Sequence, residues 1–592
     1  MSTTDETKAK GDGAGGGGRP PRRQPAWMKP AKRYGPIVVV LALIGAAVLV
    51  FGGGGDDGDD DADTAAGGGT ATEDELIESG PMTWQKAELE GTTESIDWGP
   101  NCDTETGRIK LVSVYAPPCV EPFEGGNGGA TSPGVTADTV KIVHYISDPA
   151  LDPLAAATVS GAGADISPET AIQTSQGYAD LYNKLFETYG RRVEVEHYIG
   201  TGAGDDREAA RADAIAIAEM DPFMVVGGPA TGASPVFASE LGARGILCGS
   251  FCALSIPESL VEEHAPYLWQ NAPTPNQAAA LAAEMIGKLA GPGKAELAGD
   301  DATRAQDRVY GLLHYDTPDG DHREVFEELR DQLADNGIEL ATDIEFPLDF
   351  AAAQENARTN IARLRDAGVT TIIYYGDPFN PGPLTMEATA QDYHPEWILG
   401  PNALMDTSLF ARLTDMQQWK NGFGIGLTNA RGVQETNGAF RIWDWAYGGL
   451  PPNNTANVLE PRLRTVFTGI HLAGPELTPE AFRDGLFRYP PSGGGPTEPQ
   501  ISRGDHGVWP DPDWGGVDDA AIIWFDPEAT GEDEVGNQGQ GLYRYANGGE
   551  RYTLGEFPET FEEAGLFDNE SSVTIYEEVP PEDDTPDYPP PE

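Results

Sequence analysis

The chain has 592 residues, enough for two to four domains, and 39% of them are hydrophobic, which suffices for sizeable cores. It carries 96 Asp and Glu against 38 Lys and Arg, a formal net charge of −58, and so acidic a protein is repelled by nucleic acid. Eight His and four Cys leave little material for a zinc or iron–sulfur site. We therefore expect no nucleic-acid partner, no metal and no cofactor.

One apolar segment lies near the N-terminus. Residues 37–51 (IVVVLALIGAAVLVF) carry no charge, and their flanks extend the uncharged run to about twenty residues, long enough to span a bilayer as a helix. Lys29, Lys32 and Arg33 precede it, and positive flanks stay in the cytoplasm. The pattern predicts a signal anchor in the cell membrane, single-pass, with a cytoplasmic N-terminus and an extracytoplasmic main domain. A cleaved signal peptide is the alternative, disfavoured by the long leader.

Two polar segments are expected to lack a packed core. The stretch 53–80 is mostly Gly, Asp and Ala, typical of a disordered and self-repelling linker. Residues 577–592 (EEVPPEDDTPDYPPPE) form an acidic, Pro-rich segment that reads as a solvated tail.

The four cysteines fall into two close pairs. Cys102 and Cys119 bracket a short segment, and Cys248 and Cys252 lie four positions apart in CGSFC. An oxidising exterior favours two local disulfides, of which the first would add about 3 kcal/mol by closing its loop. A metal-binding or redox pair at Cys248 and Cys252 is the alternative, but no His or third Cys lies nearby.

The next part of the chain alternates between strand and helix patterns. Apolar runs predict strands at 140–147, 191–200, 223–228 and 246–250. Helical spacing marks the segment with Tyr178, Tyr182 and Leu185, and further helices are predicted at 207–220 and 234–244. Such alternation predicts a parallel sheet with helices on both faces.

The alternation restarts after Pro273. Strands are predicted at 308–315, 339–346, 369–375 and 396–400, with helices at 323–336 and 352–367. A third helix starts at Thr478-Pro479-Glu480, and β segments follow at 520–526 and 541–546. Two successive α/β units indicate two lobes with a cleft between them, a usual place for a small ligand.

Catalytic motifs are missing. The sequence has no HExxH, GxSxG, phosphate-binding loop or GxGxxG after a strand. Ser502, Asp505 and His506 look like triad components, but they sit in one Gly- and Pro-rich loop, whereas a triad converges from separate elements. We therefore expect a binding protein and not an enzyme.

Polar residues cluster where the predicted strands end. In the first set these are Thr231, Ser234 and Ser255, which with backbone N–H groups would hold a carboxylate. In the second set Asp316 and Asp377 occupy the equivalent places. Hydroxyls facing carboxylates suit a zwitterion. The alternative for each residue is helix capping, which Ser, Thr and Asp commonly perform after strands.

Five segments in order along the chain resemble one known family. They are residues 133–148 (PGVTADTVKIVHYISD), 224–234 (MVVGGPATGAS), 265–277 (APYLWQNAPTPNQ), 367–378 (AGVTTIIYYGDP) and 396–406 (EWILGPNALMD). Together they resemble the type 1 periplasmic binding proteins, the leucine/isoleucine/valine-binding group, over roughly residues 133–546. The resemblance implies an α/β fold of two parallel-sheet lobes with three hinge crossovers, near residues 273, 401–403 and 494–507.

The resemblance also implies a site and a partner. Members of the family close over a ligand, often an amino acid, and deliver it to an ABC permease. Their carboxylate-binding positions fall on the loops holding Thr231, Ser234, Ala253 and Ser255, and their ammonium-binding acid falls on Asp377. Tyr315 and Asp316 fall on the other wall of the second lobe.

Together these patterns predict a membrane-anchored solute-binding protein for a small zwitterionic or carboxylate ligand. There are two alternatives. One is a ligand-sensing ectodomain or scaffold that acts through a signalling partner, and the other is an exported amide hydrolase.

The expected organisation is a cytoplasmic tail (1–35), a transmembrane helix (36–52), a linker (53–80), a disulfide-containing lead-in (81–135), lobe 1 (136–273), lobe 2 (274–402), a return to lobe 1 (403–500), closing strands of lobe 2 (501–560) and a tail (561–592).

Overall fold

The computed structural model describes residues 73–151, 156, 160, 164–229, 232–253, 256–316, 320, 322–347, 352–402, 404–534 and 536–591. All of them belong to one compact unit, Gly55–Glu592. The predicted transmembrane helix and cytoplasmic tail lie outside these residues. Among the helices that the structure does describe, none is long and apolar enough to cross a membrane.

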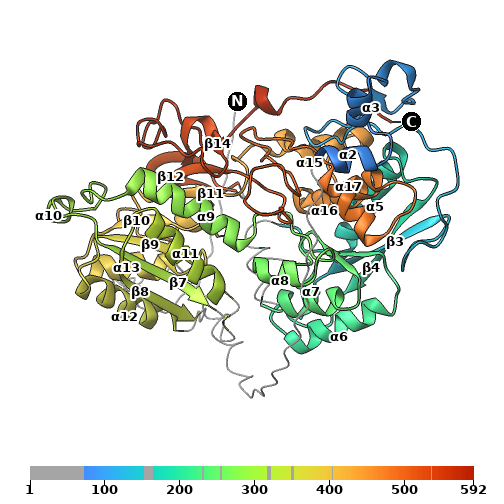
Figure 1. The fold of residues 1–592 in the computed structure, drawn as a ribbon. Coiled ribbons are helices and arrows are strands. Elements are labelled where there is room, and N and C mark those ends of the chain that lie inside the picture. Colours follow the sequence, from blue (N-terminus) through green and yellow to red (C-terminus); the bar gives the residue numbers. More distant parts are fainter. Residues whose placement is uncertain are drawn as a thin grey trace, which may run out of the picture. The chain divides into compact units, whose positions relative to one another are not determined.

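The first sheet has four parallel strands in the order β4-β3-β5-β6 (Figure 1). Its strands are β3 (Thr139–Ile146), β4 (Arg192–Ile199), β5 (Met224–Val226) and β6 (Leu247–Gly249). The connecting helices are α5 (Pro168–Leu185), α6 (Arg207–Ala218), α7 (Ser234–Gly242) and α8 (Glu258–Glu263). The predicted parallel α/β arrangement is confirmed here.

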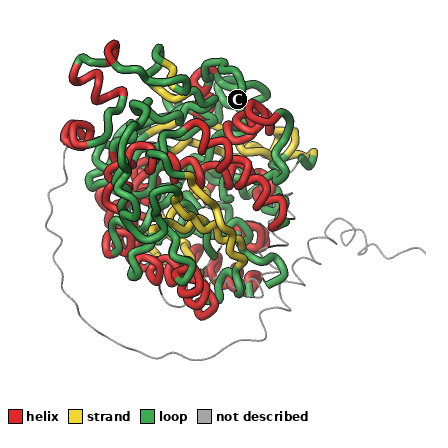
Figure 2. Tube along the Cα trace, turned by 90° about the vertical axis from the view of Figure 1, so that its right-hand side faces the viewer, coloured by secondary structure: helices red, strands yellow, loops and turns green. Residues whose placement is uncertain are grey.

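Two apolar layers cover this first sheet because successive side chains of a strand point to opposite faces. On one face, Val140 and Ile142 of β3 pack with Tyr178 and Tyr182 of α5. On the other face, Val143 packs with residues of α6 and α7. Figure 2 shows the strands in yellow lying inward and many of the helices in red toward the outside. The first sheet and its helices are called lobe 1 below.

The second sheet runs β13-β12-β11-β10-β9-β7-β8, with β14 beside β12. Strands β7 to β11 are parallel, and β12 to β14 are antiparallel to their neighbours. The strands are β7 (Tyr310–Asp316), β8 (Leu340–Pro347), β9 (Thr371–Tyr375), β10 (Glu396–Leu399), β11 (Phe423–Gly426), β12 (Ala520–Glu532), β13 (Gln538–Tyr545) and β14 (Arg551–Tyr552). The helices of this lobe 2 are α9 (Pro275–Met285), α10 (Asp301–Arg304), α11 (Arg323–Asp335), α12 (Ala353–Asp366), α13 (Pro381–Ala390) and α14 (Ser408–Ala411).

Three later helices return to lobe 1. They are α15 (Gly438–Tyr447), α16 (Ala456–Ala473) and α17 (Pro479–Phe487). Their residues Phe440, Phe467 and Phe482 lie in the same apolar cluster as Val140 of β3. Helix α17 begins as predicted, because the Thr478 side chain accepts a hydrogen bond from the N–H of Ala481.

The chain therefore passes between the lobes three times. The first crossover is the segment 270–274, before α9, and the third is 488–519, between α17 and β12. The second is 427–437, later than the boundary expected at 401–403. The reason is β11, which pairs with β10 and β12 in the second sheet and keeps the chain in lobe 2 up to Gly426.

The lead-in segment is built into lobe 1. It contains α3 (Trp84–Glu90), β1 (Cys102–Asp103) and β2 (Arg108–Ile109). Both predicted disulfides are present, Cys102–Cys119 with Cα atoms 5.6 Å apart and Cys248–Cys252 with Cα atoms 5.4 Å apart. The first holds the lead-in near α16, where the backbone carbonyl of Pro118 lies 2.9 Å from Nε2 of His471.

Both polar segments contribute packed residues, contrary to expectation. Residues 73–79 form helix α2 (Glu73–Ser79), and Ile77 is buried there. Near the other end, Asp583 accepts hydrogen bonds from the N–H and the hydroxyl of Thr497, and the Tyr588 hydroxyl donates to Asp103. The C-terminal segment is thus fixed to the third crossover and to the lead-in, because its acids and tyrosines find partners that composition does not reveal.

Candidate functional site

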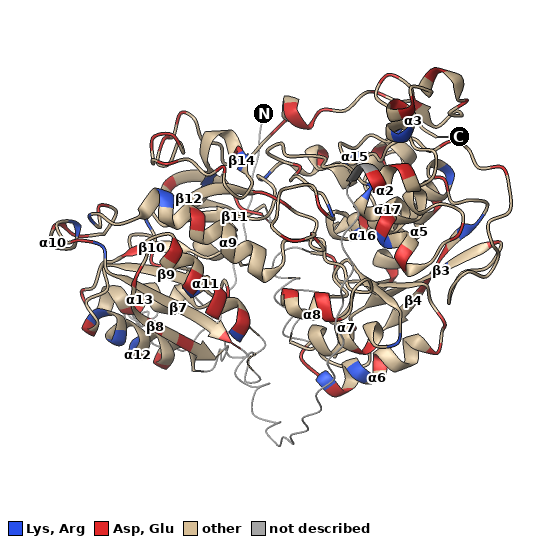
Figure 3. Ribbon diagram, in the orientation of Figure 1, with Lys and Arg blue, Asp and Glu red and all other residues tan. Residues whose placement is uncertain are grey.

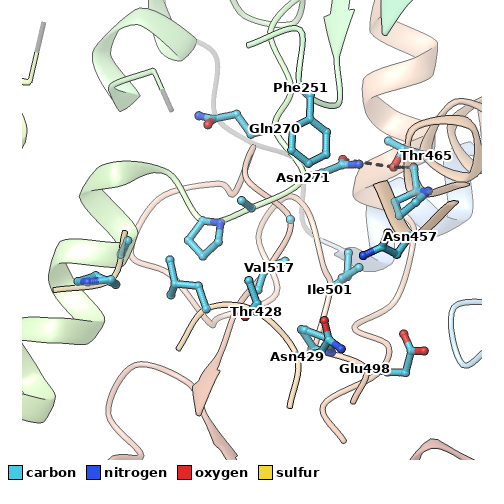
Figure 4. A pocket seen from close by; sticks show the side chains of 18 of the residues that line it. Phe251, Gln270, Asn271, Thr428, Asn429, Asn457, Thr465, Glu498, Ile501 and Val517 are labelled. Atoms are coloured by element: carbon cyan, nitrogen blue, oxygen red, sulfur yellow. Dashed lines mark hydrogen bonds between the residues drawn. The ribbon is translucent and has the colours of Figure 1, made fainter. Parts of the chain in front are cut away.

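A cavity of about 420 Å³ lies between the lobes, where the three crossovers meet (Figure 4). It is bounded by the first crossover, by residues after β6, β7, β10 and β11, by α16 and by the third crossover. Its apolar walls include Phe251, Phe326, Tyr375, Ile425, Leu427 and Ile442. Its polar walls include Gln270, Asn271, Asn402, Asn429, Asn437 and Asn457. Apolar walls with several carboxamides are typical of a small-molecule site.

The first and third crossovers are bonded to each other at the cavity wall. Arg503 of the third crossover donates to the backbone carbonyl of Gln270 at 3.1 Å and to Oδ1 of Asn271 at 2.9 Å. The Thr465 hydroxyl of α16 also donates to that oxygen, at 3.3 Å (Figure 4). Helix α16 and the third crossover therefore both bond to the side-chain amide of Asn271, which lies more than 190 positions earlier in the chain. A ligand in the cavity would contact the crossover segments that join the lobes.

A buried ion pair forms part of the cavity wall on α16. Nε of Arg464 donates to Oε1 of Glu460, one helical turn earlier, at 2.9 Å. The Tyr182 hydroxyl donates to the same carboxylate, and the Arg464 guanidinium lies over the Tyr115 ring, 4.2 Å from its centroid. Burial alone would lower the pKa of Arg464, but Glu460 and the surrounding tyrosines raise it above its ordinary value. Arg464 is therefore charged in this wall of the cavity.

Glu498 of the third crossover is the carboxylate of the cavity that titrates near neutral pH. Its Oε1 accepts a hydrogen bond from the N–H of Gly438 at 3.1 Å. Burial, followed by the nearby charge of Asp583, raises the pKa of Glu498 to about 7, although Arg464 opposes the shift. At pH 6 the side chain is mostly protonated and can donate a hydrogen bond; at pH 8 it is mostly an anion.

We expect this raised pKa to make the folded state less stable as the pH rises. A carboxyl group whose pKa is higher in the folded state favours folding at low pH, and that contribution is lost as the pH rises through about 7. The contribution of Glu498 to the free energy of unfolding should therefore fall between pH 5 and pH 8, by roughly 3 kcal/mol or less, and Glu498→Gln should remove that fall. Urea unfolding of both proteins at pH 5 and pH 8 measures this change in the free energy of unfolding. Identical falls in the two proteins would contradict the assignment.

Of the described residues predicted to bind a ligand, only Tyr315, at the end of β7, lines the cavity. Asp377 instead accepts hydrogen bonds from the N–H groups of Phe379 at 2.8 Å and Asn380 at 3.0 Å, and from Nδ2 of Asn380. These bonds engage Asp377 in the turn leading into α13. Asp377 is not the N-cap of α13, because that position is Asn380.

The other predicted residues are also directed elsewhere or lie outside the described residues. Asp316 accepts from the N–H of His322 at 3.1 Å. Ser234 is buried and donates to the carbonyl of Cys252 at 3.3 Å, and Ala253 is fully buried. Thr231 and Ser255 are not among the described residues.

Sequence reasoning missed the residues supplied by the crossovers. Asn271, Glu498 and Arg503 come from two segments without a strand or helix pattern, so periodicity gives no signal for them. Glu460 and Arg464 do carry a signal, since an acid and an arginine four positions apart face each other on a helix.

No protein-family model and no curated protein matches the sequence. Solved structures similar to the chain include a solute-binding protein of an ABC transporter from Rhodopseudomonas palustris BisB5 in complex with 3,4-dihydroxybenzoic acid (13% identity, 70% of this chain and 98% of that one, TM-score 0.45). Another is a leucine-, isoleucine-, valine-, threonine- and alanine-binding protein from Brucella ovis (11% identity, 74% and 100%, TM-score 0.49). A third is a fatty acid ABC transporter substrate-binding protein from Thermomonospora curvata (14% identity, 71% and 94%, TM-score 0.45). All three are described as binding proteins.

Proposed function

We propose that the chain is an extracytoplasmic solute-binding protein that holds a small ligand between its two lobes and delivers it to an ABC permease. The observation that carries the proposal is the cavity of about 420 Å³, whose walls come from both lobes and all three crossovers. A ligand there contacts both lobes at once. It would therefore favour the arrangement of the lobes that brings its contacts together.

The walls suit a ligand of amino-acid size and character, zwitterionic or carboxylate. Aromatic and aliphatic side chains can bury an apolar body, and the carboxamides can donate to or accept from polar groups. The volume falls within the usual range of small-molecule pockets. Residues 36–52 would hold the binding unit at the membrane, close to its permease.

A thermal-shift screen tests this function. Residues 55–592, which form one compact unit, would be heated with amino acids, amides, small carboxylates and oligopeptides. A ligand at a hundredfold its dissociation constant should add about 2.7 kcal/mol to the free energy of unfolding. Binding by one chemical class supports the proposal, and no shift with any class would contradict it.

A pull-down with the full chain separates transport from sensing. A transport protein should retain an ABC permease from its own membrane when the ligand is present. Retention of a signalling protein instead would favour the ectodomain alternative.

A further inference from the structure

One arginine beside the cavity has few hydrogen-bond partners among the described residues. Arg462 lies on α16, next to Pro461, which lines the cavity. Its guanidinium lies over the ring of Phe251, 4.9 Å from the centroid, and NH1 lies 3.1 Å from Nε2 of His144. Its Nε is shielded from solvent and has no hydrogen-bond partner among the described residues.

The Arg462 side chain is partly exposed as a whole, and it has fewer described partners than two buried arginines. Arg464 pairs with Glu460, whereas Arg488 donates to the backbone carbonyls of Leu76 and Leu472. Arg462 has no carboxylate within 4.0 Å among the described residues. Arg488 and Arg503 likewise have none, although the chain has 96 acidic residues, which Figure 3 shows spread over both lobes. A guanidinium has five N–H donors, and the described residues accept from one of its nitrogens.

The histidine beside Arg462 does not supply a charge. Arginine can only donate, so Nε2 of His144 is the acceptor, and its proton is on Nδ1, 3.2 Å from the Ser175 hydroxyl. Burial, and then the charge of Arg462, lower the pKa of His144 well below its usual value. The ring is therefore neutral. Burial also lowers the pKa of Arg462 to about 10, which leaves the guanidinium charged at neutral pH and without a counter-charge.

The backbone around Arg462 brings this charge to the carboxyl edge of the first sheet. Gly227 directly follows β5 with φ +73°, and a Cβ there would lie 2.9 Å from NH1 of Arg462. Phe251 lies within the loop closed by the Cys248–Cys252 disulfide, with φ +65°. Its ring lines the cavity (Figure 4), and the guanidinium of Arg462 lies over it. The positive charge is therefore at the margin of the cavity.

We propose that Arg462 binds the acidic group of the ligand and that the ligand is an organic anion with an apolar or aromatic body. This inference rests on the solute-binding function proposed above and adds the residue that binds the acidic group. A carboxylate would supply the missing counter-charge and accept from the free guanidinium nitrogens in the geometry that arginine favours. The body of the ligand would extend past Phe251 into the cavity.

Matched acids and amides test the proposal. The probes are benzoate with benzamide, isovalerate with isovaleramide, and leucine with leucinamide, measured by thermal shift and calorimetry on residues 55–592. At least one acid should bind at least tenfold more tightly than its amide. Arg462→Gln should weaken that binding by at least tenfold, and Arg462→Lys by less. The control is Arg488→Gln, a buried arginine that does not line the cavity and donates to the carbonyls of Leu76 and Leu472; this variant should lower the melting temperature but leave the affinity unchanged.

A measurement without ligand separates binding from structural support. Because Arg462 has no counter-charge in the fold, Arg462→Gln should leave the melting temperature unchanged or raise it. A drop as large as that of Arg488→Gln, or an affinity for acids that Arg462→Gln leaves intact, would overturn the proposal. Amides that bind as well as acids would overturn the anion site but leave the solute-binding function. Absence of binding by any probe would contradict both.

Discussion

Arg464→Met is expected to lower the free energy of unfolding by about 3–5 kcal/mol. The substitution leaves the carboxylate of Glu460 buried without its counter-charge, and only 4% of that side chain is exposed. It also removes the cation from the face of the Tyr115 ring. The loss should appear in urea unfolding at pH 7 as a lower midpoint with an unchanged slope.

A double variant shows whether the cost is that of an unpaired charge. Glu460→Gln combined with Arg464→Met removes both charges, so it should be less destabilising than Arg464→Met alone. Glu460→Gln alone completes the comparison. If the loss in the double variant equals the sum of the losses in the two single variants, Glu460 and Arg464 are not coupled and this interpretation of the cavity wall is wrong.

Arg551→Met is expected to cost a similar amount, about 3–5 kcal/mol, and to act on the hinge. The Arg551 side chain is fully buried on β14 and bonds to Asp519, at the end of the third crossover, at 2.8 Å. It also donates to the carbonyls of Thr428 at 2.9 Å and Leu427 at 3.2 Å, at the start of the second crossover. One side chain therefore fastens two of the three connections between the lobes.

The matched control is Arg544→Met on the neighbouring strand β13. Arg544 bonds to Asp526 at 2.7 Å, but its side chain is 18% exposed, so solvent can compensate and the loss should be about 1 kcal/mol. Urea unfolding of both variants compares the loss from Arg551→Met with the loss from Arg544→Met. Equal losses of unfolding free energy would mean that burial at the hinge has no special effect.

Arg551→Met should in addition lower the affinity for any ligand found by the thermal-shift screen, because Leu427 and Thr428 line the cavity.

Much of the fold is predictable because its signals are local. The run of apolar residues in β3 and the β-branched run in β9 predict buried parallel strands, and Thr478-Pro479-Glu480 marks the start of α17. The two cysteine pairs are also close in sequence. Strand β11 was not predicted, since its four residues, two of them glycine, lie below the length at which periodicity is recognisable.

The site is less predictable because its residues come together only in three dimensions. A residue that follows a strand can cap the next helix or face a ligand, and sequence does not separate the two roles. Asp377 accepts hydrogen bonds within the turn before α13, while Tyr315 lines the cavity. Asn271 and Arg503, 232 positions apart, share a hydrogen bond that depends on the crossing of the lobes. Arg462 is marked by an Nε without a described partner and by its position over Phe251, neither of which the sequence reveals.

Calorimetric titration of residues 55–592 with the best ligand from the screen tests the central claim most directly. A solute-binding protein should take up one ligand per chain, with a negative heat-capacity change from burial of the apolar walls, and mass spectrometry should recover the ligand chemically unchanged. Conversion of the ligand to a product, or a signal without saturation at one equivalent, would contradict the account.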